Sequence, residues 1–281
     1  MILENKYNIP KIIHYCWFGG NEPSEKMKYC IETWKKYLPD YEIKEWNDEN
    51  IKDIKSPYLG AAVKNKMWAF VADYIRFWAL YNYGGIYLDT DIEVFKTFDE
   101  LLDNKFFIGL ESSKEDTLSI GTAAIASVKG LDILDAILKM YDNHNPIRKN
   151  GHFDYFATSP KMLVDFVKDK YGYNFNELKY KNKITEIEPN CKVFPEIYFS
   201  AHKNVTSNTY CKHHFAGDWG VQWQVKTLIN LKTIKLHVFK KMNKKAKTLP
   251  ILKNEELLFY LKLNSKKSIA LVKVICDEED F

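Results

Sequence analysis

Two aspartates separated by a single residue, Asp89 and Asp91, are the side chains in this sequence best placed to do chemistry. They directly follow the apolar run 86–88. On a strand, residues i and i+2 point to the same side, so we expect both carboxylates to converge on one point. Two adjacent carboxylates repel each other unless a cation lies between them, and Mg²⁺ or Mn²⁺ would accept these oxygens and leave positions for phosphate. Taken alone, the pattern is weak and also fits a solvated turn after a strand.

A second pair of charged residues, Asp73 and Arg76, lies in a helical segment that is apolar nearly all round. Their spacing of three puts them on one helix face. Charged residues such as Asp and Arg are rarely buried unless they are paired, so the burial of these two calls for an explanation. They form either a structural ion pair or a pair directed at a polar ligand, with Arg76 offering a planar donor fork. The turn at Gly84 and Gly85 should bring this helix face to Asp89.

The segment HHFAGDWG, residues 213–220, is a third candidate. On a strand, only one of the two histidines faces inward, and a neutral imidazole could complete a metal site begun by two carboxylates. A histidine is more often a core or surface residue. Trp219, with Gly217 and Gly220 close by, could cover a pocket, although a core Trp is the commoner explanation.

The elements that must position these residues alternate between strands and helices. Such an alternation predicts an α/β fold with a mostly parallel sheet and a helical C-terminal annex. Predicted strands cover 12–17, 41–46, 86–88, 105–111 and 122–126, with shorter ones around Ile184, Val193 and Tyr210. Predicted helices cover 24–37 with Ser24 as cap, 61–83 ended by Gly84, 131–142, 160–171 and 221–241.

The composition limits the class of protein. Of 281 residues, 46% are hydrophobic and 28% charged, which is typical of a globular protein and excludes a disordered or multi-span membrane chain. The five cysteines form no CxxC pair, so a disulfide framework or zinc knuckle is disfavoured and a reducing compartment fits. No signal peptide or transmembrane run is expected, and we expect a cytoplasmic location.

Basic charge is concentrated late in the chain. Residues 219–254 contain nine Lys and no Asp or Glu. The chain has only two arginines, Arg76 and Arg148, which disfavours a sequence-specific nucleic-acid binder because base-edge readout relies on Arg. The predicted basic helix 221–241 either packs on the domain with a solvated Lys face or docks on the anionic inner face of a membrane.

Three motifs together resemble the DxD-containing sugar transferases. They are IPKIIHYCWFGG, AFVADYIRFWALYNYGGIYLDTD and HHFAGDW. This family includes bacterial capsule and O-antigen enzymes, the yeast initiating mannosyltransferase and the catalytic domains of large clostridial glucosylating toxins. The resemblance covers roughly 9–111 and 209–223. It implies a single GT-A-like nucleotide-sugar domain over 1–220, with the basic annex 221–281 packing on it.

The resemblance also implies roles for individual residues. Trp17 matches the aromatic residue that stacks on uracil, and Asp73 and Arg76 match the pair that binds the donor sugar. Asp89 matches the first DxD acid, which touches ribose and sugar and meets the metal mostly through water. Asp91 matches the direct metal ligand. The remaining implied residues are His214 as a late metal contact, Trp219 over the glycosidic or β-phosphate oxygen, and Tyr15, Gly85 and Tyr87 in the nucleotide-sugar site.

The function that the resemblance implies is a retaining glycosyltransferase that depends on Mn²⁺ or Mg²⁺. It would move a hexose from a nucleotide sugar, UDP-linked by expectation, to a glycan or lipid-linked glycan in capsule or O-antigen synthesis. Asp218 departs from the family, which often has Ser there. A DxD phosphohydrolase, a non-catalytic sugar- or nucleotide-binding protein and a protein-modifying effector stay open as alternatives.

Overall fold

The computed structural model describes residues 8–114, 117–147, 158–200, 205–216, 235–239, 256–263 and 268–275. The chain divides into two compact units. The first comprises Met1–Arg148 and His152–Ala216, and the second comprises Lys149–Gly151 and Gly217–Phe281. The candidate site residues that are described all lie in the first unit.

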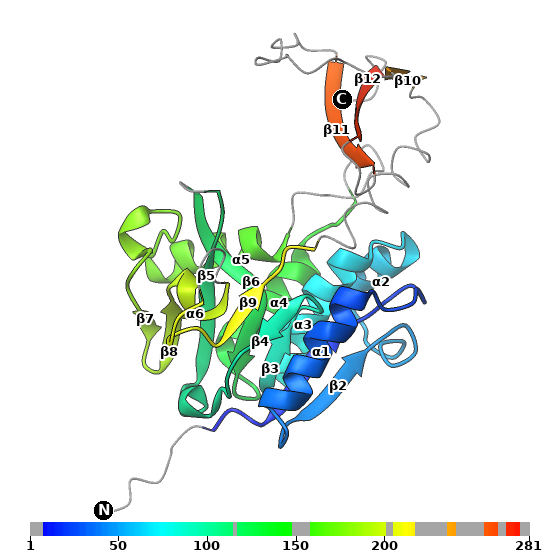
Figure 1. The fold of residues 1–281 in the computed structure, drawn as a ribbon. Helices are drawn as coiled ribbons and strands as arrows, with labels where there is room; N and C mark the ends of the chain where they lie inside the picture. Colours follow the sequence, from blue (N-terminus) through cyan, green and yellow to red (C-terminus); the bar gives the residue numbers. More distant parts are fainter. Residues whose placement is uncertain are drawn as a thin grey trace, which may run out of the picture. The chain divides into compact units, whose positions relative to one another are not determined.

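A seven-stranded sheet forms the centre of the first unit (Figure 1), with the order β2-β1-β3-β6-β5-β8-β7. Strands β1, β2, β3, β5 and β8 run in one direction, while β6 and β7 run in the other. The predicted mostly parallel α/β sheet is therefore confirmed. The strands are β1 (Ile12–Cys16), β2 (Glu42–Trp46), β3 (Gly85–Leu88), β5 (Phe106–Lys114), β6 (Thr117–Ser127), β7 (Thr185–Glu188) and β8 (Cys191–Phe194).

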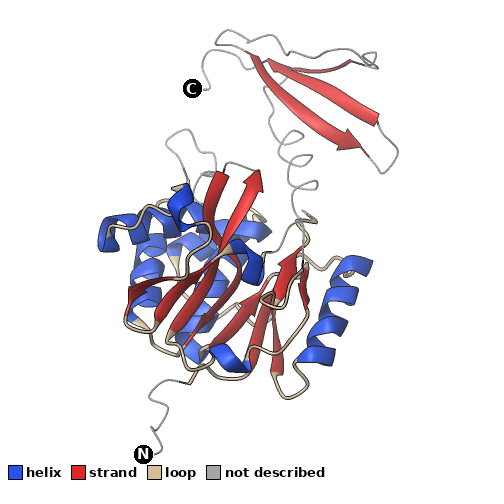
Figure 2. Cartoon of the chain, turned by 60° about the vertical axis from the view of Figure 1, so that its left-hand side comes forward, coloured by secondary structure: helices blue, strands red, loops and turns tan. Residues whose placement is uncertain are grey.

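Helices lie against both faces of this sheet (Figure 2). Helices α3, α4 and α5 contact one another, and α3 and α5 pack on β6. The other face carries α1 and α6 together with a small two-stranded sheet of β4 and β9. These elements are α1 (Glu25–Tyr37), α2 (Pro57–Lys64), α3 (Trp68–Tyr83), α4 (Asp132–Asn143), α5 (Ser159–Tyr171), α6 (Glu196–Phe199), β4 (Ile92–Val94) and β9 (Cys211–His213).

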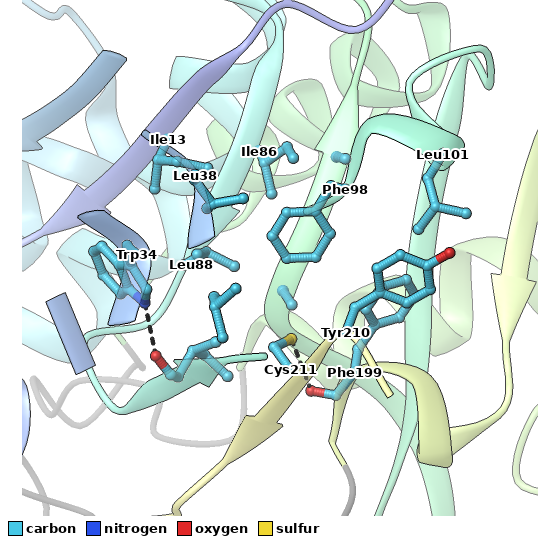
Figure 3. Close-up of a cluster of buried hydrophobic side chains, with 14 of the residues drawn as sticks. Ile13, Trp34, Leu38, Ile86, Leu88, Phe98, Leu101, Phe199, Tyr210 and Cys211 are labelled. Atoms are coloured by element: carbon cyan, nitrogen blue, oxygen red, sulfur yellow. Dashed lines mark hydrogen bonds between the residues drawn. The ribbon is translucent and has the colours of Figure 1, made fainter. Parts of the chain in front are cut away.

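The main core lies between the sheet and the layer of α1, β4, β9 and α6 (Figure 3). Ile86 and Leu88 of β3 face this core, where the indole of Trp34 donates a 2.7 Å hydrogen bond to the Ile92 carbonyl. Because strand side chains alternate, Tyr87 between them faces the opposite layer and α3. Tyr87, which belongs to the candidate site, therefore lies on the side of the sheet that faces α3.

The segment predicted as one helix over 61–83 forms two helices, so that prediction was wrong. Helix α2 ends at Lys64, and α3 begins at Trp68. Lys66 between them has φ +55°, a left-handed conformation that an α-helix cannot contain. The predicted helix end is confirmed, since Gly84 with φ +70° follows Tyr83.

In the second unit, the described residues form a three-stranded antiparallel sheet of order β10-β12-β11. Its strands are β10 (Lys235–Phe239), β11 (Glu256–Leu263) and β12 (Ser268–Ile275). The predicted helix 221–241 and helical annex are thus wrong where the structure describes them, because 235–239 pairs along β12. The rest of that predicted helix lies outside the described residues. No described helix is long and apolar enough to span a membrane.

Candidate active site

Strand β3 and the glycine turn before it place the DxD motif. Gly84 and Gly85 have φ +70° and +105°. A Cβ on Gly85 would lie 2.5 Å from the Ile12 carbonyl oxygen, so only glycine allows β3 to approach β1 this closely. His14 Nε2 donates a 2.8 Å hydrogen bond to the Gly84 carbonyl, and its Nδ1 accepts from Trp46 Nε1 at 3.2 Å. The turn is therefore fixed from inside the fold.

The DxD residues lie in a turn, not on a strand. Strand β3 ends at Leu88, and Ile92 N donates to Asp89 O at 3.0 Å, which closes a tight turn over Thr90 and Asp91. The expectation that strand alternation presents both acids was therefore wrong. Both carboxylates nevertheless belong to this one turn, and Asp91 is among the groups that raise the pKa of Asp89, after burial as the main cause.

The guanidinium of Arg76 is buried, and each of its nitrogens meets a protein acceptor. Nη2 lies 3.0 Å from Asp73 Oδ1 and 3.5 Å from Asp89 Oδ1. Nη1 donates to Thr122 O at 2.5 Å and Thr122 Oγ1 at 3.1 Å. Nε donates to Ala72 O at 3.3 Å. The ion pair with Asp73 that the sequence left open is present, and the contact of Arg76 with a donor sugar stays a prediction.

Asp89 is held on the α3 side of the sheet. Its Oδ1 accepts a 2.9 Å hydrogen bond from the Tyr87 hydroxyl, and the Arg76 guanidinium lies 4.7 Å over the Tyr87 ring. Burial raises the pKa of Asp89 and outweighs the opposing effect of Arg76. Burial also keeps the pKa of Tyr87 well above its usual value, so its hydroxyl retains the proton that it donates.

Asp91 lies against the late histidine segment. Its Oδ2 accepts from Ala216 N at 2.8 Å, and its Oδ1 lies 3.3 Å from His213 Nε2. His213 Nδ1 lies 3.1 Å from Glu111 Oε2, so the imidazole bridges two carboxylates. Burial raises the pKa of Asp91, but the larger combined effect of His213 and the Ala216 amide lowers it. Burial lowers the pKa of His213, but its two carboxylate partners raise it to about 10.

The predicted metal contact, His214, faces a different acid. Its Nε2 lies 2.8 Å from Glu93 Oε2, whose other oxygen accepts a 2.5 Å hydrogen bond from Tyr29. The structure therefore brings the ring of His213 to the Asp91 carboxylate, while His214 meets Asp91 through its backbone amide, which donates to the Asp91 carbonyl at 3.1 Å. Sequence reasoning singled out the histidine pair but not Glu111, which carries no motif of its own.

The other predicted residues are placed as follows. Trp17 is partly exposed just beyond β1, and its indole donates to Asn21 O at 2.7 Å. Tyr15 lies in the main core, where its hydroxyl donates to Glu45 at 2.6 Å rather than to Asp73 or Asp89 beside Arg76. Trp219 lies outside the described residues. The roles of these residues in nucleotide binding stay predictions.

A divalent metal fits the oxygen donors at this turn. Mg²⁺ and similar hard ions are commonly bound by one or two carboxylates, with substrate phosphates and water completing the shell. Asp89 and Asp91 supply two such carboxylates on one turn. Among the described residues, no group of three or more His, Cys, Asp or Glu side chains is arranged to hold a metal. Such a site would leave positions for substrate phosphates and water.

Comparisons with known proteins agree on one class. Residues 24–108 match the family model described as the glycosyltransferase sugar-binding region containing the DXD motif. An inositol phosphoceramide mannosyltransferase 3 of Schizosaccharomyces pombe is 32% identical over 167 residues, covering 55% of this chain and 44% of that protein. An uncharacterized glycosyltransferase of Acanthamoeba polyphaga mimivirus is 28% identical, covering 62% of this chain and 76% of that protein.

A solved structure described as PaToxG glycosyltransferase aligns with a TM-score of 0.48 and 21% identity, covering 59% of this chain and 71% of that one. The match to the mannosyltransferase spans less than half of that protein's length. The family match confirms the resemblance predicted from the sequence. Residues 24–108 of this chain are thus similar to the sugar-binding region of the DXD-containing glycosyltransferases.

Proposed function

We propose that this protein is a retaining, metal-dependent glycosyltransferase that moves a hexose from a nucleotide sugar to a glycan acceptor. The observation that carries the proposal is the array in which Asp73, Arg76 and Asp89 meet beside the turn that bears Asp91. A sugar presents hydroxyl donors, and carboxylates are strong acceptors for them. The family match over 24–108 supports the same class of reaction.

In this proposal, the residues of the chain bind and orient the donor. Asp73 and Asp89 accept hydrogen bonds from donor hydroxyls, and Trp17 stacks on the base. Asp89 and Asp91 hold the divalent ion, which supplies positive charge where the departing diphosphate becomes negative. Arg76 adds a fixed charge that keeps the two carboxylates of Asp73 and Asp89 in place.

The proposed step breaks the bond from the anomeric carbon to the phosphate oxygen and forms a bond to the acceptor hydroxyl. The acceptor proton passes to the released diphosphate, so no other reactant is required. Retention follows if the acceptor attacks from the side that the diphosphate leaves. The family resemblance, rather than any distance in the site, is the basis for expecting retention.

The proposal also names the donor nucleotide sugar and the acceptor. We favour a UDP-linked hexose with Mn²⁺, and a glycan or lipid-linked glycan of the capsule or O-antigen kind as acceptor. The fission yeast relative is named as a mannosyltransferase acting on inositol phosphoceramide, so mannose belongs among the donor sugars to test, and a lipid-borne hydroxyl among the acceptors.

A ligand panel tests the proposal directly. The melting temperature is measured with UDP, GDP and their hexose conjugates, each with Mn²⁺ and with chelator. A ligand at 100 times its dissociation constant stabilises the fold by about 2.7 kcal/mol. We expect a metal-dependent rise with one nucleotide and its sugar, and hexose transfer in the same mixture. Release of inorganic phosphate without transfer would favour the phosphohydrolase, and no rise with any nucleotide would refute the proposal.

We also propose a cytoplasmic location with peripheral contact at the inner face of the membrane. The support is the charge of residues 219–254, with nine Lys and no acid. Each Lys near an anionic surface contributes about 1 kcal/mol. Co-sedimentation with phosphatidylserine vesicles at low salt, lost at high salt, is the expected result. Equal sedimentation with neutral vesicles, or none, would rule the contact out.

A further inference from the structure

Ser159, the first residue of α5, makes two hydrogen bonds to the donor-site acid Asp73. Its amide donates to Asp73 Oδ2 at 3.0 Å and its hydroxyl to Asp73 Oδ1 at 2.7 Å. Ser159 is 0% exposed, and Asp73 is 8% exposed. Since the contact is buried, both hydrogen bonds are shielded from competing water.

These contacts belong to a closed ring whose hydrogen-bond directions follow from chemistry. A carboxylate only accepts and a guanidinium only donates. The Ser159 hydroxyl therefore donates to Asp73 and accepts from Thr122 Oγ1, which lies 2.8 Å away. Thr122 Oγ1 accepts in turn from Arg76 Nη1 at 3.1 Å, and Arg76 Nη2 returns to Asp73. Each hydroxyl donates once and accepts once.

The ring decides how Asp73 can meet a ligand. An ionised carboxylate has about four lone-pair sites. Three are directed at Arg76 and at the two donors of Ser159. The carboxylate is thereby held in one rotamer with about one acceptor direction left for a hydroxyl of a bound sugar. Without the Ser159 hydroxyl, Asp73 loses one of these three contacts, and its carboxylate is held less firmly in that rotamer.

We propose that Ser159 is a positioning residue for recognition of the donor sugar, acting through Asp73. This inference rests on the proposed function, in which Asp73 binds the sugar part of the donor. Ser159 belongs to α5, a helix outside the DxD segment, so the sugar-binding acid is oriented from a distant part of the sequence. Trp17, which stacks on the base, and the metal acid Asp91 lie outside the ring, whereas the other metal acid, Asp89, contacts it through Arg76.

The experiment compares two affinities in each variant. Dissociation constants are measured by calorimetry with Mn²⁺ for UDP-glucose against UDP, and for GDP-mannose against GDP. In Ser159→Ala, we expect the affinity for the nucleotide sugar to fall about tenfold and that for the nucleoside diphosphate to change less than about twofold. A loss of fold or packing would weaken both ligands together.

Matched variants separate positioning from stability. Ser127→Ala removes another fully buried serine hydroxyl, which donates to the Val128 carbonyl outside the ring, and should leave both affinities unchanged. Thr122→Val breaks the ring at its next member, while Thr122→Ser keeps the hydroxyl and should retain wild-type affinity. If Ser159→Ala fails to fold, the comparison of Thr122→Val with Thr122→Ser tests the proposal in its place.

Two results would overturn the inference. One is an equal loss of affinity for the nucleotide sugar and for the nucleoside diphosphate in the ring variants. The other is no loss of affinity for either ligand. If the wild-type protein binds no nucleotide at all, the proposed function fails, and the inference fails with it. A wild-type protein that binds both ligands, with ring variants indistinguishable from it, removes only the role of Ser159.

Discussion

His213 Nε2 lies 3.3 Å from Asp91 Oδ1, while Nδ1 of the same ring lies 3.1 Å from Glu111 Oε2. A single imidazole thus separates two partly buried carboxylates that would otherwise repel each other. Gly121 leaves room for Glu111, since an added Cβ there would lie 2.9 Å from the Glu111 side chain. The metal acid predicted from the sequence is therefore held by a histidine next to the predicted one.

Replacing that histidine should destabilise the metal-free protein. His213→Gln keeps a polar side chain but cannot donate to both carboxylates from one planar ring. Losing a hydrogen bond to a charged group costs about 1.5–3 kcal/mol. We expect the free energy of unfolding in urea with chelator to fall by this amount. His214→Gln is the control, because its ring faces the single carboxylate of Glu93, to which Gln can still donate; an equal or greater loss there would contradict the prediction.

Asp91→Asn should remove metal dependence and keep the fold. The amide oxygen can still accept from the Ala216 amide, which now bonds Asp91 Oδ2 at 2.8 Å. The negative charge that binds a divalent ion is lost, so Mn²⁺ affinity should fall more than about tenfold, and hexose transfer with it. Asp165→Asn, in an exposed ion pair with Lys161, serves as the control. Unchanged Mn²⁺ binding by calorimetry would remove Asp91 from the metal site.

Arg76→Lys should be damaging although the charge is conserved. A Lys ammonium is a single point, whereas the guanidinium of Arg76 meets Asp73, Asp89 and Thr122 from separate nitrogens. A buried acceptor left unsatisfied costs about 1–3 kcal/mol. We expect that loss in urea unfolding, together with weaker nucleotide-sugar binding. Wild-type stability in Arg76→Lys would show that the planar fork is dispensable.

His14 predicts a specific pH dependence of stability. Burial, opposed by the Gly84 hydrogen bond and helped by Lys44, lowers the pKa of His14 from 6.5 to about 4. As pH falls from 6.5 to about 4, the unfolded chain takes up a proton that the folded protein cannot, so stability is lost through that window. The full loss is about 3 kcal/mol.

The measurement is the free energy of unfolding from pH 7.5 to 4.5 for the wild type and for His14→Gln. Gln can still donate to the Gly84 carbonyl but does not titrate. The wild type should therefore lose more stability than His14→Gln on acidification, because other acids contribute equally to both. Parallel curves would mean that His14 titrates normally in the folded protein.

Much of the fold could be predicted because its signals are local. Ser24 caps α1 as expected, accepting from Met27 N at 3.2 Å, and Gly84 ends α3. The break at Lys66 was missed although the polar run 64–66 interrupts the apolar pattern, because a Lys rather than a Gly takes the positive φ there. The strand at 235–239 was missed because Lys and apolar residues at imperfect helical spacing resemble a basic helix, while the pairing with β12 is a non-local contact.

The sequence by itself determined the chemistry of the site: two acids one residue apart, an Asp and Arg on one helix face, and a histidine pair. Residue types and short spacings suffice for that, because they fix charge and donor capacity. Only the tertiary structure decided the partners, bringing Ser159 to Asp73 and Glu111 to His213 across long stretches of chain. Such contacts depend on the order of the strands and the packing of α5, and no local pattern encodes which buried hydroxyl or carboxylate completes a hydrogen-bond network.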